Sequence, residues 1–167
     1  MSVADILQAI ATATFVGAFA FGAIQVVTAR RARSEQAAIE IVHSVQNGPF
    51  GSAWRIVCEL PTGVSAADVD ARGAELARAA DDMMMALEPL GYLVFRRVVP
   101  FYIANDLIGG VTMASWDRLR DWFEASRERT ANPRLAEWYQ WLAERLAEHA
   151  HDQEAAFREF NDWRPSR

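Results

Sequence analysis

The sequence predicts an all-α protein, in which one N-terminal transmembrane helix continues into a cytoplasmic helical bundle of about five helices. The run 6–29 contains no charged residue, and about 20 apolar residues are enough for a helix to cross a bilayer. Beyond this run, apolar residues recur at spacings of three and four positions, which is typical of helices. No stretch shows the sustained alternation that indicates a strand.

Charged residues flank the apolar run in an order that favours a retained anchor. Asp5 precedes the run, whereas Arg30, Arg31 and Arg33 follow it. A signal peptide carries its basic residues on the other side, and basic residues collect on the cytoplasmic side of a span. We therefore expect the N-terminus outside a bacterial inner membrane, residues 34–167 in the cytoplasm, and the three arginines at anionic lipid headgroups.

The run is only moderately apolar, which leaves a second interpretation open. Its polar residues include Gln8, Thr12, Thr14 and Gln25. With these side chains, the same segment also fits a buried hairpin helix of a soluble bundle. The two interpretations differ in whether lipid or protein covers the apolar side chains.

Small residues recur at four-residue spacing along the run. Such rows let two helix backbones approach closely within a bilayer. The alternative is that alanine is simply abundant in this chain. One row contains Ala9, Ala13 and Gly17, and another contains Thr14, Ala18 and Gly22. We expect an interface within the membrane at Ala13, Gly17, Ala18 and Gly22, with a second copy or another membrane protein subunit as the partner.

Length and charge set further limits. A chain of 167 residues accommodates one span and one domain, which we place at 1–33 (anchor with basic flank), 34–150 (helical domain) and 151–167 (tail). The net charge of −5, without a basic stripe beyond the juxtamembrane arginines, argues against a nucleic-acid partner. All 17 basic residues are arginine, which indicates a GC-rich bacterial genome. The single cysteine, Cys58, excludes an internal disulfide, and its apolar neighbours predict a core thiol.

The sequence of the first part of the domain predicts two helices. Ala37, Ile41 and Val45 share a helical face, so the membrane helix should continue to about Gln46 and end at 47–49. A short helix should follow and end at a proline-glycine turn. One face of this short helix contains Trp54, Val57 and Cys58.

Ser65 is the expected N-cap of the next helix, with Asp68 three residues on in a variant of the capping box. This helix should cover 66–87, either whole or broken at Gly73. Its apolar face contains Leu76, Ala80, Met83, Met84 and Leu87.

Residues 89–91 can kink the chain after this helix. A polar break at Arg96–Arg97 then precedes a long helix at 100–129. Proline in the first turn of a helix is favourable. Gly109–Gly110 marks either a break or a notch where another helix crosses closely. The expected buried residues of the long helix are Ala104, Leu107, Ile108, Val111, Leu119, Trp122 and Phe123.

The last strong helix should cover 134–149, after a proline-containing turn. Trp138, Tyr139 and Trp141 surround this helix, so at least one of the three rings should lie at an interface. The expected inner face is Leu135, Trp138, Leu142 and Leu146, and the tail has room for one further short helix.

The sequence contains no recognisable catalytic or phosphate-binding motif. His149 and His151 are two positions apart and do not share a helix face, which argues against a metal site. Adjacent side chains also diverge at Asp81–Asp82 and in the methionine run 83–85. An exposed acidic face explains the first group, and core packing explains the second. We expect no metal, no cofactor and no catalytic residue.

The segment from Trp116 to Arg145 resembles a bacterial family known as domain of unknown function 4760. The family's end pattern is a tryptophan, a hydrophobic helix, an arginine, a few polar residues, a proline and an aromatic helix with Leu-Ala. The resemblance implies an N-terminal span, a charged linker and a helical domain, and it implies no activity. The matching residues are Trp116, Arg127, Pro133, Trp138 and Leu142–Ala143.

These observations favour a non-enzymatic, membrane-anchored helical module that scaffolds or regulates a larger membrane protein assembly, or self-associates. The small-residue span and the surplus of tryptophan motivate this hypothesis. The alternative is an enzyme or ligand sensor with a polar site between the cytoplasmic helices. The first candidates for such a site are Asp81, Asp82, Glu88, Arg96, Arg97 and Arg127.

Overall fold

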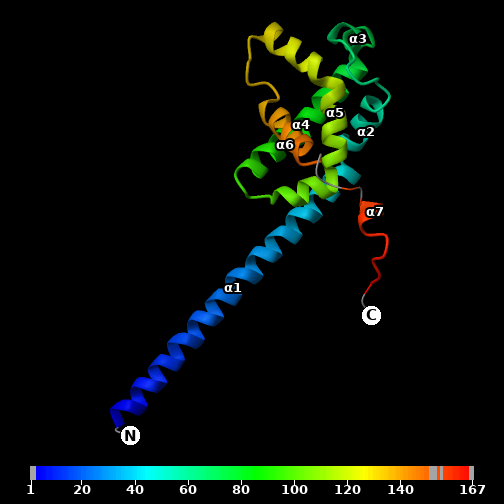
Figure 1. The fold of residues 1–167 in the computed structure, drawn as a ribbon. Helices are drawn as coiled ribbons and strands as arrows, with labels where there is room; N and C mark the ends of the chain where they lie inside the picture. The colour runs from blue at the N-terminus through cyan, green and yellow to red at the C-terminus, as the bar shows by residue number, and fades with distance from the viewer. Residues whose placement is uncertain (1–2, 151–153, 155, 166–167) are drawn as a thin grey trace. The chain divides into compact units, whose positions relative to one another are not determined.

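The computed structural model describes residues 3–150, 154 and 156–165, except for the side chains at 3–7, 9–13, 16, 30, 31, 34, 35, 42 and 44–47. Over these residues the protein is all-α, as predicted, and contains no strand (Figure 1). The chain divides into two compact units, Met1–Glu40 and Ile41–Arg167.

Helix α1 (Val3–Asn47) covers the apolar run, continues past it as predicted, and ends before Gly48. Within the residues that the structure describes, however, none of the helices combines the length and the apolar character that a bilayer crossing requires. The predicted segment is therefore a helix, but its membrane crossing is not supported. Polar side chains at Gln8, Thr14 and Gln25 interrupt the run.

Helix α2 (Pro49–Val57) begins with proline in its first turn, where the missing N–H has no helical partner to lose. Phe50, Ala53 and Val57 are buried on its inner face. The prediction of a core thiol at Cys58 is wrong, because this residue is exposed. Cys58 follows Val57 directly, and successive residues point in different directions around a helix.

The predicted helix at 66–87 is interrupted at Gly73. Ser65 caps α3 (Ala66–Ala71) as expected, since its hydroxyl accepts a hydrogen bond from the Asp68 amide. At Gly73 the backbone has φ +91°, a conformation that glycine adopts without steric cost. Helix α4 (Ala74–Phe95) then continues through Pro89 to the predicted polar break.

Helix α5 (Phe101–Thr130) runs unbroken through Gly109–Gly110, and Gly109 is buried against Leu146. This contact fits the predicted notch rather than the break. Leu107 was expected in the core but is exposed. It lies next to buried Ile108, so the inner face of α5 is turned away from position 107.

Helix α6 (Glu137–Ala150) begins three residues later than predicted, after a turn that contains Ala136 at φ +55°. Tyr139, and not Trp138, is the fully buried ring of α6. Leu142 and Leu146 are buried beside it as expected. A short helix, α7 (Ala156–Glu159), forms in the tail.

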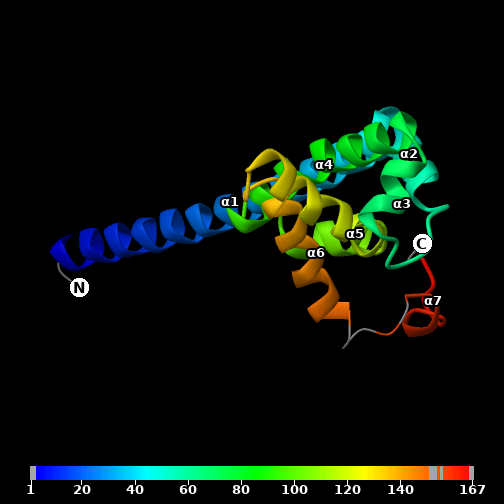
Figure 2. The same ribbon diagram turned by 90° about the horizontal axis from the view of Figure 1, so that it is seen from above.

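The helical domain packs around α4 and α5. Helix α4 contacts α2, α3, α5 and α6, and α5 contacts α2, α3 and α6. Figures 1 and 2 show α6 on one side of this pair and α2 on the other. The largest fully buried side chains include Tyr139, Phe123, Met83, Leu87 and Leu119, contributed by α4, α5 and α6.

A chain of hydrogen bonds crosses this core. The Tyr139 hydroxyl donates to Ser115 Oγ at 2.6 Å, and the Ser115 hydroxyl donates to the Thr112 carbonyl at 3.1 Å. Burial raises the pKa of Tyr139. The phenol is therefore a neutral donor, which satisfies its polar group inside the core.

Gly91 lies at a close contact between α4 and α6. Of the described glycines, it has the least room for a Cβ atom. A Cβ atom there would overlap the Trp138 carbonyl oxygen and lie 2.7 Å from the carbonyl carbon. Helix backbones come this close only where the residue lacks a side chain. The sequence predicted only a kink at 89–91, so this close contact was not expected.

Replacing Gly91 by alanine should therefore lower the free energy of unfolding by about 1–3 kcal/mol, because one of the two helices must move. The matched control is Gly110→Ala, since nothing lies within 4 Å of a Cβ atom there. Alanine at this exposed helical position should raise stability by about 0.5–1 kcal/mol. Urea unfolding of the full chain in mild detergent, followed by circular dichroism, measures both. Equal stability of the two variants would contradict the close crossing.

Candidate interaction site

The residues predicted to form an interface lie on α1. Gly17, Ala18 and Gly22 are exposed, and nothing lies within 4 Å of a Cβ atom built at either glycine. Arg33, predicted to meet lipid headgroups, is exposed as well. The side chains of the other predicted residues, Ala13, Arg30 and Arg31, lie outside the described residues.

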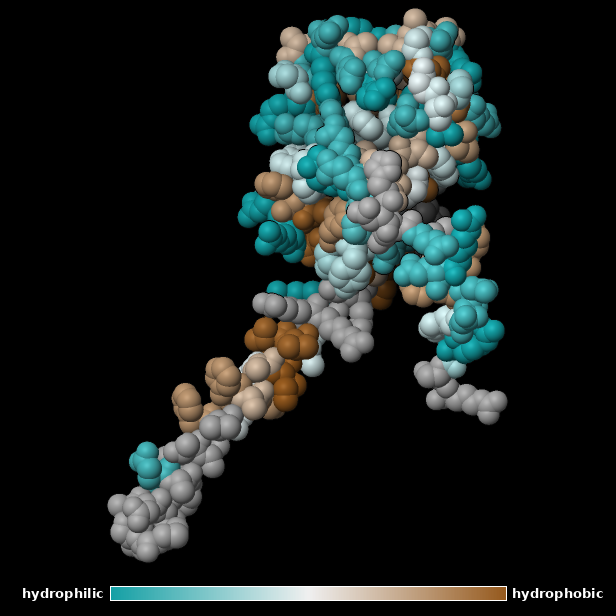
Figure 3. All heavy atoms as spheres, viewed as in Figure 1, coloured by the Kyte–Doolittle hydropathy of each residue, from teal (hydrophilic) through white to brown (hydrophobic). Residues whose placement is uncertain are grey.

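Large apolar side chains cover the same part of α1. Phe19 has 75% of its surface exposed. Figure 3 shows mainly apolar colours, tan and brown, on the described part of α1 that is nearer to its C-terminal end. Apolar patches of this kind on a protein surface mark sites of interaction with protein or membrane. The exposed large apolar residues between 15 and 27 are Phe15, Phe19, Phe21, Ile24, Val26 and Val27.

The candidates for a polar ligand site do not converge. Asp81 and Asp82 lie on α4 about 22 Å from Arg96, as the rise of a helix over 15 residues requires. Partial desolvation, followed by repulsion from Asp82, raises the pKa of Asp81. Arg96 instead donates to the Tyr92 hydroxyl at 2.9 Å. The acidic pair and the arginine pair therefore belong to different parts of the surface.

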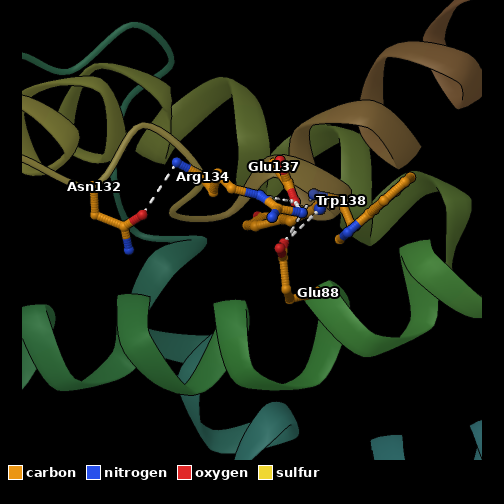
Figure 4. A network of polar contacts seen from close by, with 6 residues as sticks. Glu88, Asn132, Arg134, Glu137 and Trp138 are labelled. Carbon is orange, nitrogen blue, oxygen red and sulfur yellow. Dashed lines mark hydrogen bonds and ion pairs between the residues drawn. The ribbon is translucent and has the colours of Figure 1, made fainter.

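Glu88 holds the start of α6. Its carboxylate Oε2 accepts hydrogen bonds from the backbone amides of Trp138 at 3.0 Å and Tyr139 at 2.9 Å (Figure 4). The first amides of a helix have no partner within the helix, and a negative charge there also meets the positive end of the helix dipole. Glu88 is thus an N-cap supplied by a neighbouring helix.

Charged side chains also fix the turn before α6. Arg134 donates from Nε and Nη2 to Glu137 Oε1 at 2.9 and 2.6 Å, and these bonds lower the pKa of Glu137. Arg127, on α5, donates to the carbonyls of Leu135 at 2.8 Å and Ala136 at 3.3 Å. Both members of the predicted ligand site on this side, Glu88 and Arg127, therefore stabilise the turn.

A surface hollow of about 410 Å³ lies beside Arg127. Its lining mixes two acidic residues, Glu124 and Glu128, with the arginine and with Ala131 and Pro133. The Arg127 guanidinium is already engaged with two backbone carbonyls of the turn. The hollow therefore offers charges of mixed sign rather than a convergent polar site.

Four aromatic rings meet on the outer face of the α4–α6 contact. Tyr92 and Phe95 come from α4 and pack against Trp138 with ring centroids 5.5 and 4.7 Å apart. Trp141, one turn further along α6, contacts Phe95 at 5.7 Å. We call Tyr92, Phe95, Trp138 and Trp141 the aromatic surface. Tyr92 and Phe95 are exposed, and the two tryptophans are half-buried.

The spacing of residues in α4 could have identified this contact. Glu88, Gly91, Tyr92 and Phe95 recur at positions i, i+3, i+4 and i+7, which is one face of a helix. The face combines an acid, a glycine and two aromatic residues, so a search for apolar positions alone does not find it. Trp138 and Trp141 are half-buried, whereas Tyr139 is fully buried, so the interface predicted for an aromatic ring of α6 stays a prediction that concerns these two tryptophans.

Asp70 links α3 to α5. Its carboxylate accepts hydrogen bonds from the Trp122 indole at 2.8 Å and from Arg129 at 2.5 Å. These two bonds, the indole bond first, hold the pKa of Asp70 below its usual value. The ionised carboxylate is therefore favoured in the folded state.

The comparisons with known proteins identify the family. A family model described as a domain of unknown function, DUF4760, matches residues 7–146. Because the match covers most of the chain, the protein belongs to this family, and the resemblance noted for 116–145 is confirmed. No curated protein matches the chain, and no solved structure matches it.

Removing the Glu88 carboxylate should release the start of α6. Glu88→Ala should cost about 1–3 kcal/mol, because two amides lose a charged acceptor. Glu88→Gln should cost less, since its amide oxygen still accepts. Chemical unfolding measures stability, and near-ultraviolet circular dichroism reports the packing of the adjacent tryptophan. If both variants unfold like the wild type, Glu88 does not cap α6.

Acid should weaken the contact of Asp70. A carboxylate whose pKa is lowered on folding stabilises the protein at pH above its unfolded pKa, and this contribution is lost as the pH falls through the folded pKa. Thermal melts should therefore show Asp70→Asn less stable than wild type at neutral pH, with the gap closing as the pH falls below 3.8, the ordinary pKa of aspartate. The control is Glu124→Gln, on the exposed face of α5. A gap independent of pH would contradict the argument.

Proposed function

We propose that this protein is a non-enzymatic, membrane-associated helical module that uses the apolar part of α1 to join a larger membrane protein assembly or a second copy of itself. The helical domain would then scaffold or regulate that assembly. Arg30, Arg31 and Arg33 favour an arrangement with the helical domain in the bacterial cytoplasm and the N-terminus outside.

The exposed apolar surface of α1 carries this proposal. Six large apolar side chains between Phe15 and Val27 are exposed on a helix whose run 6–29 has no charge. Water disfavours such a surface, and lipid or another apolar helix would cover it. A second apolar helix, which offers side chains of the same kind, is the covering partner that we propose.

The small residues of α1 support a helix as the partner. Gly17, Ala18 and Gly22 leave room for a second backbone, and close packing is the main source of helix association in lipid. The exposed Gln25 can add a hydrogen bond between helices, as polar residues do in membrane bundles. Two of the six polar candidates, Glu88 and Arg127, support the fold of the domain, which leaves them fewer free donors and acceptors for a ligand.

The proposal predicts that the chain is found in the membrane fraction as a complex larger than 18.7 kDa, and that Gly17→Leu or Gly22→Leu converts it to a smaller species. Leucine closes the space that a partner backbone would occupy, and lipid gives no compensating gain. Both glycines are surrounded by open space within the chain, so the substitutions leave α1 itself undisturbed. Native mass spectrometry in mild detergent measures the mass.

Phe19→Leu and Phe21→Leu are the controls, because they change the same helix without filling the space beside Gly17 and Gly22. Protease added to the cytoplasmic face of the same membranes should remove the helical domain. A monomer in the soluble fraction would refute the proposal. A complex that is equally insensitive to all four substitutions would place the contact on another helix.

A further inference from the structure

The turn between α4 and α5 presents apolar side chains on a hydrogen-bonded backbone. Val98 and Val99 donate from their amides to the Leu93 carbonyl at 3.0 and 3.3 Å, and the Arg97 amide donates to Val94. Val94 and Val99 are buried and fix the turn to the domain. Figure 1 shows the turn at the edge of the helical domain. Its outer side chains are therefore held outward by the fold.

These outer side chains are apolar and aromatic. Val98 has 61% of its surface exposed, and Phe95 has 49%. Leu93 and Tyr92 are exposed on the preceding turn of α4. Tyr92 also belongs to the aromatic surface, where its ring contacts Trp138. An exposed patch of this kind marks a binding surface.

The charge of this region differs from that of the chain. Between Glu88 and Asp106 the only charged residues are Arg96 and Arg97, whereas the whole chain carries a net charge of −5. The Arg96 guanidinium donates to the Tyr92 hydroxyl at 2.9 Å and lies 5.7 Å from the centre of its ring. Two exposed cations thus stand beside the apolar side chains.

We propose that the α4–α5 turn surface, formed by Tyr92, Leu93, Phe95, Arg96, Arg97 and Val98, binds the surface of an anionic lipid bilayer. Aromatic and apolar side chains flanked by arginine match the chemistry of the membrane interface, where rings lie at headgroup level and guanidinium groups meet phosphate. The local positive charge complements anionic headgroups. This second contact does not depend on α1, so it extends the proposed function without resting on it.

The test uses the full chain with Cys58→Ser, which removes the single cysteine. A polarity-sensitive fluorophore is attached at Val98→Cys. The matched control is Glu128→Cys, which is exposed near the other end of α5, about 40 Å along the helix from its first residue, Phe101. A third label at Phe19→Cys reports on α1. Each labelled chain is reconstituted in vesicles that carry quencher-labelled lipid, made either of phosphatidylcholine alone or with phosphatidylglycerol added.

The label at position 98 should be quenched about twofold or more in anionic vesicles, with less quenching in neutral vesicles, while the label at 128 stays unquenched. Arg97→Gln should reduce the quenching at 98, and circular dichroism shows whether the variant is folded. Leu93→Cys provides a second label site on the same surface.

Three outcomes would overturn the inference. These are a label at 98 that is unquenched in anionic vesicles, equal quenching at 98 and 128, and equal quenching in both kinds of vesicle. Quenching at 19 but not at 98 would refute this inference and leave the proposed role of α1 standing. Quenching at 98 but not at 19 would support the inference and count against attachment of α1 to the bilayer.

Discussion

The close crossing of α4 and α6 at Gly91 is the constraint on which the rest of the helical domain depends. The Trp138 carbonyl occupies the space that a side chain at 91 would fill, and Glu88, one turn earlier, binds the first amides of α6. Glycine sets the distance between the helices, and the carboxylate sets where α6 begins. With both fixed, Tyr139 points into the core and its hydroxyl reaches Ser115.

Arginine side chains complete this arrangement by binding backbone carbonyls in the connecting turns. Arg118 donates to the Leu60 carbonyl at 2.9 Å and Arg127 to that of Leu135 at 2.8 Å. These carbonyls lie outside regular helix, where they need partners of another kind. A guanidinium offers several donors in a fixed plane, which lysine does not. The exclusive use of arginine therefore has structural consequences here, beyond the base composition that the sequence indicates.

Local signals allowed most of the fold to be predicted, and contacts between distant residues account for what was missed. Ser65 and Gly73 give positions for the ends of helices, because capping and positive φ depend on one residue and its neighbours. Tyr139 and Trp138 differ by one position, and the contacts that accompany the inward position of Tyr139 come from distant residues, Glu88 at its amide and Ser115 at its hydroxyl. The candidate site on α1 could be predicted, because it depends on side-chain size and charge along one helix. The partner that would cover this site could not be predicted, because the same pattern does not specify it.

The register of α6 also accounts for the aromatic surface. Trp138 and Trp141 lie outside because Tyr139 and Leu142 lie inside, and adjacent positions differ by about 100° around a helix. A shift of one residue would bring Trp138 to the position of Tyr139 and remove the hydrogen bond to Ser115. The core therefore explains why the outer side chains keep their places, but it does not require them to be aromatic. The bilayer contact that we propose would supply that requirement, since rings beside Arg96 and Arg97 are favoured at a membrane interface more than in water.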